Sequence, residues 1–175
     1  DEILSRMRRR YRTDLYAARV RKIKEVMPQA CIGVDVIVGF PGEDDAAFQT
    51  THSFLESLDV SYFHVFTYSE RARTTALRLE GTVPQSIRSD RNRHLRMLGL
   101  MKQRAHIHSF IGQTKPVLWE HAEEEGMRLG YTPEYVRVAA PADAVAPNSI
   151  QPFRLERLEN GWVQGSLVAA LTPSR

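Results

Sequence analysis

The residues best suited to chemistry lie in the stretch Val34–Phe48, with the sequence VDVIVGFPGEDDAAF. Asp35 is a carboxylate within an apolar run, and burying a carboxylate is costly unless it is hydrogen-bonded. The hydroxyl groups of a ligand such as a ribose, or a neighbouring arginine, would satisfy it. Gly39 and Gly42 follow, and glycine lets the backbone turn sharply and a flat ligand approach closely. A tight strand-to-helix turn without any ligand is the equal alternative.

A second candidate for ligand binding is the arginine-rich stretch Met7–Tyr11, with the sequence MRRRY. The planar guanidinium of arginine can make two parallel hydrogen bonds to a carboxylate or phosphate. No paired nucleophile and base is evident, and His106 and His108 have the wrong spacing for two metal ligands on one helix face. The single cysteine, Cys31, cannot ligate an iron–sulfur cluster, which takes several. The sequence therefore indicates a ligand site without a visible reaction centre.

Alternating helix and strand patterns place these residues at one edge of a parallel sheet. Thr13 is expected to cap the first helix, and Cys31–Val38 is apolar enough for a parallel strand covered on both faces. A helix from about Asp44 and an aromatic strand at Ser61–Tyr68 continue the α/β pattern with a right-handed crossover. Ligands collect at the carboxyl ends of such strands, where the Gly-Phe-Pro-Gly turn lies. Two strands cannot bury themselves, so further strands are expected to precede Asp1 or to come from elsewhere.

The second half of the chain has a different pattern of expected secondary structure. A long helix is expected from Pro84 to about Ile111. From Thr114, short strand-like runs alternate with turn residues, including the hairpin signal Asn160-Gly161. About five short strands in roughly sixty residues indicate a small β-barrel. The sequence thus predicts two domains, residues 1–113 and 114–175. The buried face of the long helix is expected to consist of Ile87, Leu95, Leu98, Met101 and Ala105.

Composition and charge narrow the classes of function. The chain has 175 residues and a net charge of +3. No apolar run approaches the roughly 20 residues that span a bilayer, so no membrane partner is expected. Lys and Arg concentrate in residues 1–27 and 84–113, whereas acids outnumber bases from Thr114 onward. Such basic clusters favour a polyanionic partner, with solvated helix faces as the equal alternative. A single cysteine fits a reducing cytoplasm.

Three ordered motifs of this chain resemble those of the radical-SAM methylthiotransferases. They are MRRRY, then DVIVGFPGE with Phe48, then HVFTYSERARTTAL. The tail, with VLWE, GYTPEYVRV and GSLV, is similar to the TRAM module of those enzymes. The resemblance covers nearly the whole chain. It implies an α/β fold in which the C-terminal part of a partial (β/α) radical-SAM barrel precedes a small all-β barrel of the TRAM, OB-like kind.

The same resemblance implies an enzyme that adds a methylthio group to C2 of an N6-modified adenosine next to the anticodon. YSERA and GYTPEYVRV look most like the branch that acts on threonylcarbamoyladenosine. The implied cofactors are S-adenosylmethionine and [4Fe–4S] clusters, and the implied partner is the tRNA anticodon stem-loop. The cluster cysteines would lie in a missing N-terminal part of the same polypeptide, so this chain alone should be inactive. A transferase for a ribosomal-protein aspartate, a non-catalytic RNA-binding module and an empty structural turn are the alternatives.

Residue roles follow from the resemblance position by position. Arg9 is expected to hold the methionine carboxylate and Asp35 the ribose, while Arg71-Ala72-Arg73-Thr74 lacks the usual glycine and indicates a different local turn. Arg73 could add a phosphate contact. The other expected cofactor contacts are Gly39, Phe40, Pro41, Tyr68, Ser69 and Arg71. The expected RNA contacts, from basic and aromatic side chains, are Arg88, Arg91, Arg96, Lys115, Tyr131, Arg137 and Arg154.

Overall fold

The structure is a computed structural model that describes residues 1–72 and 74–168. The chain forms two compact units, one over Asp1–Gln103 and one that begins at Arg104. No helix within the described residues is both long and apolar enough to cross a membrane.

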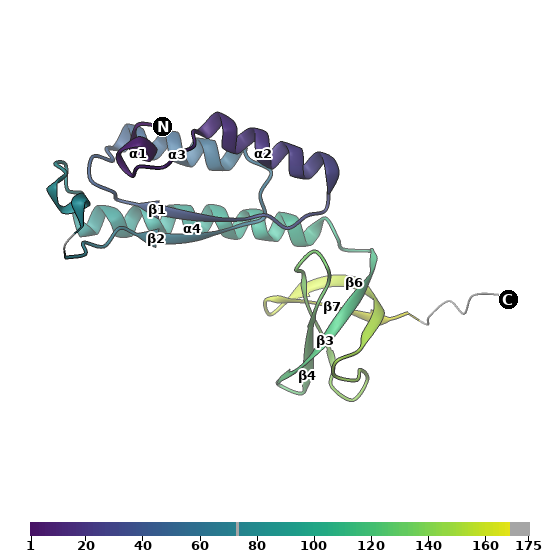
Figure 1. Cartoon of the computed structure of the whole chain (residues 1–175). Coiled ribbons are helices and arrows are strands. Elements are labelled where there is room, and N and C mark those ends of the chain that lie inside the picture. Colours follow the sequence, from purple (N-terminus) through teal and green to yellow (C-terminus); the bar gives the residue numbers. More distant parts are fainter. Residues whose placement is uncertain (73, 169–175) are drawn as a thin grey trace. The chain divides into compact units, whose positions relative to one another are not determined.

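Two parallel strands form the centre of the first unit (Figure 1). Strand β1 (Gly33–Val38) pairs with β2 (Tyr62–Thr67), and α3 (Asp45–Ser57) connects them. The predicted parallel pairing is confirmed. The remaining helices of this part are α1 (Glu2–Arg6), α2 (Thr13–Val26), the 3₁₀-helix η1 (Thr75–Arg78) and α4 (Gln85–His108).

The start of α2 differs from the prediction that Thr13 caps this helix. Thr13 is the first helical residue, and its backbone N–H donates to Oδ1 of Asp1 at 2.9 Å. The Asp1 carboxylate also pairs with Arg12. A carboxylate from outside the helix thus satisfies one of the free N–H groups at its start.

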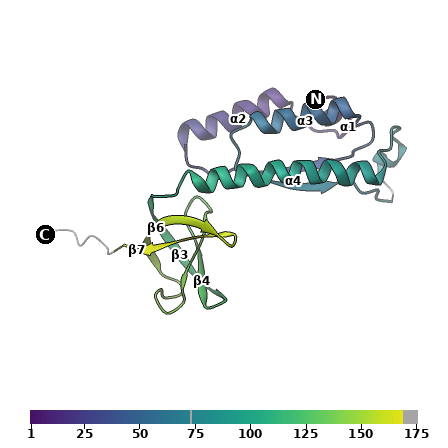
Figure 2. The same cartoon turned by 180° about the vertical axis from the view of Figure 1, so that it is seen from behind.

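The sheet is covered on one face only, which corrects the prediction of a strand buried on both faces. Helix α4 lies behind the strands in Figure 1 and in front of them in Figure 2. Val34, Val36 and Val38 face this covered side and belong to the core with Leu95 and Leu98. The intervening side chains alternate to the opposite face, where Asp35, His64 and Phe66 are exposed. Asp35 is therefore not a buried carboxylate.

The buried face of α4 agrees with the expected one at Leu95 and Leu98 and differs from it at the other positions. Ile87 and Met101 are 38% and 61% exposed, whereas Arg88 and Arg91 are only 4% and 5% exposed. The buried stripe consists of Arg88, Arg91, Leu95, Leu98 and Gly99. The two arginines are three residues apart and in phase with the leucines, so both halves of the stripe share one helical face. Charged partners in the neighbouring loops make this burial possible.

The second unit is a closed five-stranded barrel with strand order β3-β4-β5-β7-β6. The strands are β3 (Thr114–Glu124), β4 (Met127–Tyr131), β5 (Arg137–Pro141), β6 (Ile150–Glu159) and β7 (Trp162–Leu167). The β6–β7 hairpin turns at Asn160 and Gly161, whose φ angles of 52° and 87° suit the predicted tight turn. Phe110 is 2% exposed in the barrel core, with Ile107 and Ile111 against it. The second compact unit therefore includes residues that precede Thr114.

Candidate functional site

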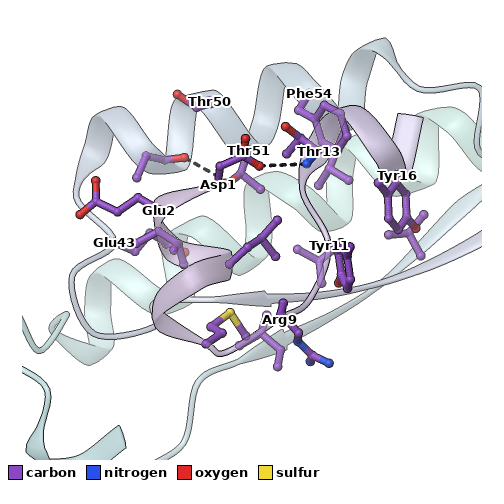
Figure 3. A pocket seen from close by; sticks show the side chains of 18 of the residues that line it. Asp1, Glu2, Arg9, Tyr11, Thr13, Tyr16, Glu43, Thr50, Thr51 and Phe54 are labelled. Atoms are coloured by element: carbon purple, nitrogen blue, oxygen red, sulfur yellow. Dashed lines mark hydrogen bonds between the residues drawn. The ribbon is translucent and has the colours of Figure 1, made fainter. Parts of the chain in front are cut away.

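The first unit contains a cavity of about 440 Å³, lined by residues of α1, α2, β1 and α3 and by the segments beside them. Arg9 and Asp35, the two residues with the most specific expected roles, both line it. Figure 3 shows Arg9 and Tyr11 on one side of this cavity and Thr51 and Phe54 of α3 on the opposite side. The volume lies within the usual range for small-molecule sites.

Arg9 and Asp35 are two of several charged residues that line this cavity, and neither side chain has a partner among the described residues. In residues 1–72 and 74–168, no hydrogen bond or ion pair engages the side chain of Arg9 or of Asp35. Aromatic rings stand beside them: Tyr11 and Tyr16 have ring centroids 6.0 Å apart, and Tyr16 and Phe54 are 6.3 Å apart. Burial raises the pKa of Tyr16, and the nearby Tyr11 and Asp35 raise it further. Tyr16 is therefore neutral at physiological pH and can donate a hydrogen bond.

This arrangement suits a ligand that carries both charges and a flat ring. The Arg9 guanidinium can bind a carboxylate, and Asp35 can accept hydrogen bonds from hydroxyl or ammonium groups. The tyrosine rings can pack against an aromatic base or attract a cation. In the part of the chain that the structure describes, no three His, Cys, Asp or Glu side chains are grouped to hold a metal ion.

The Gly-Phe-Pro-Gly turn is packed by arginines of the same unit. Gly39 and Gly42 have φ angles of 77° and 90°, which favour glycine. A Cβ atom at Gly39 would overlap the Arg88 side chain, and one at Gly42 would overlap the Arg6 guanidinium. The two glycines therefore make room for protein side chains, and nothing at their Cα atoms is left open for a flat ligand.

Arg88 connects the ends of both strands to the start of α4. Its Nε donates to the Val83 carbonyl at 2.8 Å and its Nη1 to the Tyr68 carbonyl at 2.9 Å. Two further hydrogen bonds join it to both carboxylate oxygens of Glu70. The guanidinium carbon also lies 5.4 Å from the centre of the Tyr68 ring. The hydrogen bond from Arg88 holds the pKa of Glu70 below its usual range, so Glu70 stays ionised.

Arg91 holds the other side of the turn. Its Nη1 donates to the carbonyl and to Oε1 of Glu43, at 2.8 and 2.9 Å, and its Nη2 donates to Asp45 at 2.6 Å. The same Glu43 oxygen accepts the N–H of Gly39 at 3.0 Å. Burial raises the pKa of Glu43, against the opposing effect of these donors. A buried charge with this many partners fixes the conformation of the turn.

The remaining expected cofactor contacts do not line the cavity of Arg9 and Asp35. Gly39, Phe40 and Pro41 are buried. The Phe40 ring packs edge-on against Tyr68 at 5.2 Å, and the Tyr68 hydroxyl is buried without a partner among the described residues. Arg73 lies outside the described residues. The other two expected contacts, Ser69 and Arg71, are exposed.

The expected RNA contacts fall into two groups. Arg88 and Arg91 are buried and ion-paired, so they hold internal positions where surface positions were expected. Arg96 and Arg154 are exposed, and within the described chain no ion pair engages their side chains. The others have internal contacts: Lys115 pairs with Glu134 at 2.8 Å, Arg137 with Glu124 at 3.1 Å, and the Tyr131 ring lies 6.2 Å from that of Tyr135.

Several residues of the site were not identified from the sequence. Glu43 and Glu70 lie in the quoted motifs, but only their partners on α4, far along the chain, give them a role. Tyr16 and Phe54 lie in helices, where aromatic residues at helical spacing usually indicate core packing. The spacing of Arg88 and Arg91 ahead of Leu95 and Leu98 was the available signal, because arginines in phase with a buried stripe must have internal partners.

No protein-family model matches the chain. The curated proteins that are similar to it include the following three. A threonylcarbamoyladenosine tRNA methylthiotransferase, MtaB of Bacillus subtilis, is 35% identical over 140 residues, which are 78% of this chain and 31% of that protein. A tRNA-2-methylthio-N(6)-dimethylallyladenosine synthase of Protochlamydia amoebophila is 35% identical over 129 residues, 74% of this chain and 29% of that protein. The ribosomal protein uS12 methylthiotransferase RimO of Gloeobacter violaceus is 32% identical over 160 residues, which are 88% of this chain and 36% of that protein.

The chain thus spans about a third of the length of the curated relatives it matches. Its homologues are enzymes that transfer methylthio groups. The chain belongs to the radical-SAM methylthiotransferases and corresponds to their C-terminal part, as the three motifs predict.

Proposed function

We propose that this chain is part of a tRNA methylthiotransferase that modifies threonylcarbamoyladenosine next to the anticodon. The main support for this proposal is the similarity to the threonylcarbamoyladenosine tRNA methylthiotransferase MtaB of Bacillus subtilis. The cavity, in which neither the Arg9 nor the Asp35 side chain has a partner among the described residues, supports a ligand site at the two positions named from the motifs. In this proposal residues 1–113 are the C-terminal part of the radical-SAM barrel, and the five-stranded barrel is the TRAM module.

The residues of the cavity fit S-adenosylmethionine. Arg9 would hold its carboxylate by two parallel hydrogen bonds, and Asp35 would accept hydrogen bonds from the ribose hydroxyls. Tyr11 and Tyr16 offer aromatic faces for the adenine ring or the sulfonium cation. When bound, S-adenosylmethionine supplies the one-electron chemistry of the reaction. The other expected cofactor contacts act on this site indirectly, because they shape its rim. They are Gly39, Phe40, Pro41, Tyr68, Ser69 and Arg71.

The iron–sulfur clusters do not fit this chain by itself. Its one cysteine, Cys31, is half-buried, and burial raises the pKa of its thiol, which disfavours the thiolate that a cluster needs. The cluster ligands therefore belong to the N-terminal part of the same polypeptide. Together the two parts would work in the cytoplasm, where the tRNA substrate is.

The RNA contacts are assigned to side chains that face solvent. Arg96 on α4 and Arg154 on β6 are exposed, and arginine binds phosphate oxygens by paired hydrogen bonds. Tyr131, Lys115 and Arg137 would contribute at the barrel, where aromatic rings can stack on unpaired bases. Because the barrel carries more acids than bases, α4 would supply much of the attraction to phosphate.

Mass spectrometry of tRNA nucleosides from cells that lack the full-length gene tests this function. Loss of the 2-methylthio form of threonylcarbamoyladenosine supports it. Loss of the dimethylallyl counterpart would move the substrate to the second branch, whose member from Protochlamydia amoebophila is also 35% identical, over 129 residues. Persistence of every methylthio nucleoside would refute the tRNA assignment and favour the ribosomal-protein or non-catalytic alternatives.

A further inference from the structure

Two arginines from distant parts of the chain fill the spaces at the two glycines of the turn. Arg6 of α1 lies against Gly42, and Arg88 of α4 lies against Gly39. Each also binds carbonyl groups of the polypeptide between β2 and α4. We call the described residues of that connection, 68–72 and 74–83, the rim segment.

The rim segment is attached to the turn at both of its ends. At its start, the Tyr68 N–H donates to the Val38 carbonyl at 2.8 Å, and Arg88 binds the Tyr68 carbonyl and the Glu70 carboxylate. At its end, Arg6 Nη2 donates to the Glu80 carbonyl at 2.9 Å. The Gly42 N–H donates to the Gly81 carbonyl at 2.7 Å, and Arg88 Nε binds the Val83 carbonyl.

The middle of the rim segment has weaker support. Its backbone hydrogen bonds are short-range turns of 3.2 to 3.3 Å within Arg71–Leu79. No residue between Ala72 and Leu79 is fully buried among those described. The position of this middle part therefore depends on the two attached ends, and Arg88 contributes to both of them.

We propose that Arg6 and Arg88 are positioning residues that hold the rim segment across the carboxyl ends of β1 and β2. Neither side chain lines the cavity of Arg9 and Asp35. Arg6 acts through the Glu80 carbonyl, and Arg88 acts through the Glu70 carboxylate and the carbonyl groups at both ends of the segment. The Glu70 side chain is 47% exposed, so its pair with the buried Arg88 is the part of this arrangement that opens to solvent. The consequence for substrate rests on the proposed function, because the carboxyl ends of the strands would then face the tRNA.

The geometry explains why the positioning groups are arginines beside glycines. A buried guanidinium with five donors can bind two carbonyls and a carboxylate at once, which a lysine cannot reproduce. The absence of a Cβ atom at Gly39 lets the aliphatic part of Arg88 lie directly on the turn. The rim segment and the turn therefore form one unit, and a change in either displaces the other.

The test compares Glu70→Gln with Glu80→Gln in the full-length protein that carries this chain. Both changes remove one carboxylate from the rim segment, but the Glu80 side chain has no ion pair in the described residues, and only its backbone carbonyl is used. Limited digestion with trypsin, mapped by mass spectrometry, reports opening at Arg71 and Arg78. Cleavage after Arg19 and Arg21 in α2 reports opening of the rest of the unit.

Glu70→Gln should accelerate cleavage at Arg71 and Arg78 about fivefold or more, the effect of one net charge-assisted hydrogen bond on local opening. In Glu80→Gln the cleavage rates at Arg71 and Arg78 should equal those of the wild-type protein. The cleavage rates in α2 should equal the wild-type rates in both variants. Arg88→Lys should behave like Glu70→Gln, with Arg93→Lys on the exposed side of α4 as its control. Equal cleavage rates in Glu70→Gln and Glu80→Gln would overturn the proposal, whatever reaction the protein performs.

A second readout separates positioning from a merely structural role. Glu70→Gln should lower kcat for tRNA modification and leave the Kd of S-adenosylmethionine unchanged, since the cavity of Arg9 and Asp35 is not altered. An unchanged kcat in a variant with faster cleavage would overturn the positioning role. If the unchanged protein modifies no tRNA, the proposed function fails, and the cleavage comparison still decides whether the arginines hold the segment.

Discussion

Substitution of Gly39 by alanine tests the packing of the turn most sharply. Gly39 has a φ of 77°, and an alanine Cβ would overlap the side chain of Arg88. Gly112 is the matched control because its φ is 86°, yet no described atom lies within 4 Å of the position of its Cβ. Both alanines are forced into the left-handed region, but only the one at residue 39 displaces a neighbour.

The structure gives the expected magnitudes. A non-glycine residue in the left-handed region costs about 1–2 kcal/mol, which should be the whole effect of Gly112→Ala. Gly39→Ala should cost about 3–5 kcal/mol, because a displaced Arg88 loses hydrogen bonds to charged or buried groups, worth about 1.5–3 kcal/mol. In an Arg88→Ala background the Cγ atom is gone, so the added cost of Gly39→Ala should fall back to about 1–2 kcal/mol.

Urea denaturation can follow the two units separately. Far-ultraviolet circular dichroism reports α2, α3 and α4 of the first unit. The two tryptophans, Trp119 and Trp162, both lie in the barrel, so tryptophan fluorescence reports the second unit. Gly39→Ala should shift the dichroism transition to lower urea concentration. Gly112→Ala should shift the fluorescence transition in the same direction, by the smaller amount that its lower cost in unfolding free energy predicts. The reasoning is refuted if Gly39→Ala costs no more than Gly112→Ala, or if its cost is the same with and without the Arg88 side chain.

Three further predictions concern binding and pH. Arg9→Gln should weaken S-adenosylmethionine binding by about tenfold or more in equilibrium dialysis, because one two-point charged contact is lost. The control Arg10→Gln should leave this binding unchanged, because Arg10 is exposed and does not line the cavity of Arg9 and Asp35. Because Arg88 lowers the pKa of Glu70, hydrogen-exchange protection of the rim segment should be constant at pH values above the ordinary carboxyl pKa. Protection should fall progressively as the pH drops from the ordinary carboxyl pKa to the lowered pKa of Glu70, and Glu70→Gln should abolish this dependence. Arg96→Gln should reduce the salt slope of tRNA binding by about one unit, measured by filter binding, whereas Arg157→Gln, whose charge is already paired with Glu159 in the barrel, should not.

The parallel β1–β2 pairing and the closed barrel were accessible from the sequence because each depends on local signals. Apolar runs mark the strands, and Asn160-Gly161 marks the last hairpin. The buried face of α4 was not accessible in this way. Arg88 and Arg91 can be buried because Glu70 and Glu43, from loops 18 and 48 residues earlier in the chain, neutralise them. The periodicity of apolar residues predicts which apolar side chains are buried, but it cannot predict that a charged side chain is buried in an ion pair.

The candidate site was predicted in part for a similar reason. Arg9 and Asp35 were named from motif positions, and the fold brings both to one cavity. The glycines of the turn were expected either to admit a flat ligand or to form a tight turn without one, and Gly39 was named as a cofactor contact. The structure fills the spaces at both glycines with Arg6 and Arg88. A glycine motif reveals that something approaches the backbone closely, but it does not reveal whether that group is a ligand or a side chain from elsewhere in the chain.

The most direct test of the central claim is a reaction with defined tRNA. The full-length protein, loaded with its clusters and S-adenosylmethionine under reducing conditions, is incubated with tRNA that carries N6-threonylcarbamoyladenosine, and the nucleosides are analysed by mass spectrometry. The account predicts that the modified adenosine gains a methylthio group, and that Asp35→Asn reduces the yield. A protein that leaves this nucleoside unchanged while it modifies a dimethylallyladenosine or ribosomal protein uS12 would contradict the account.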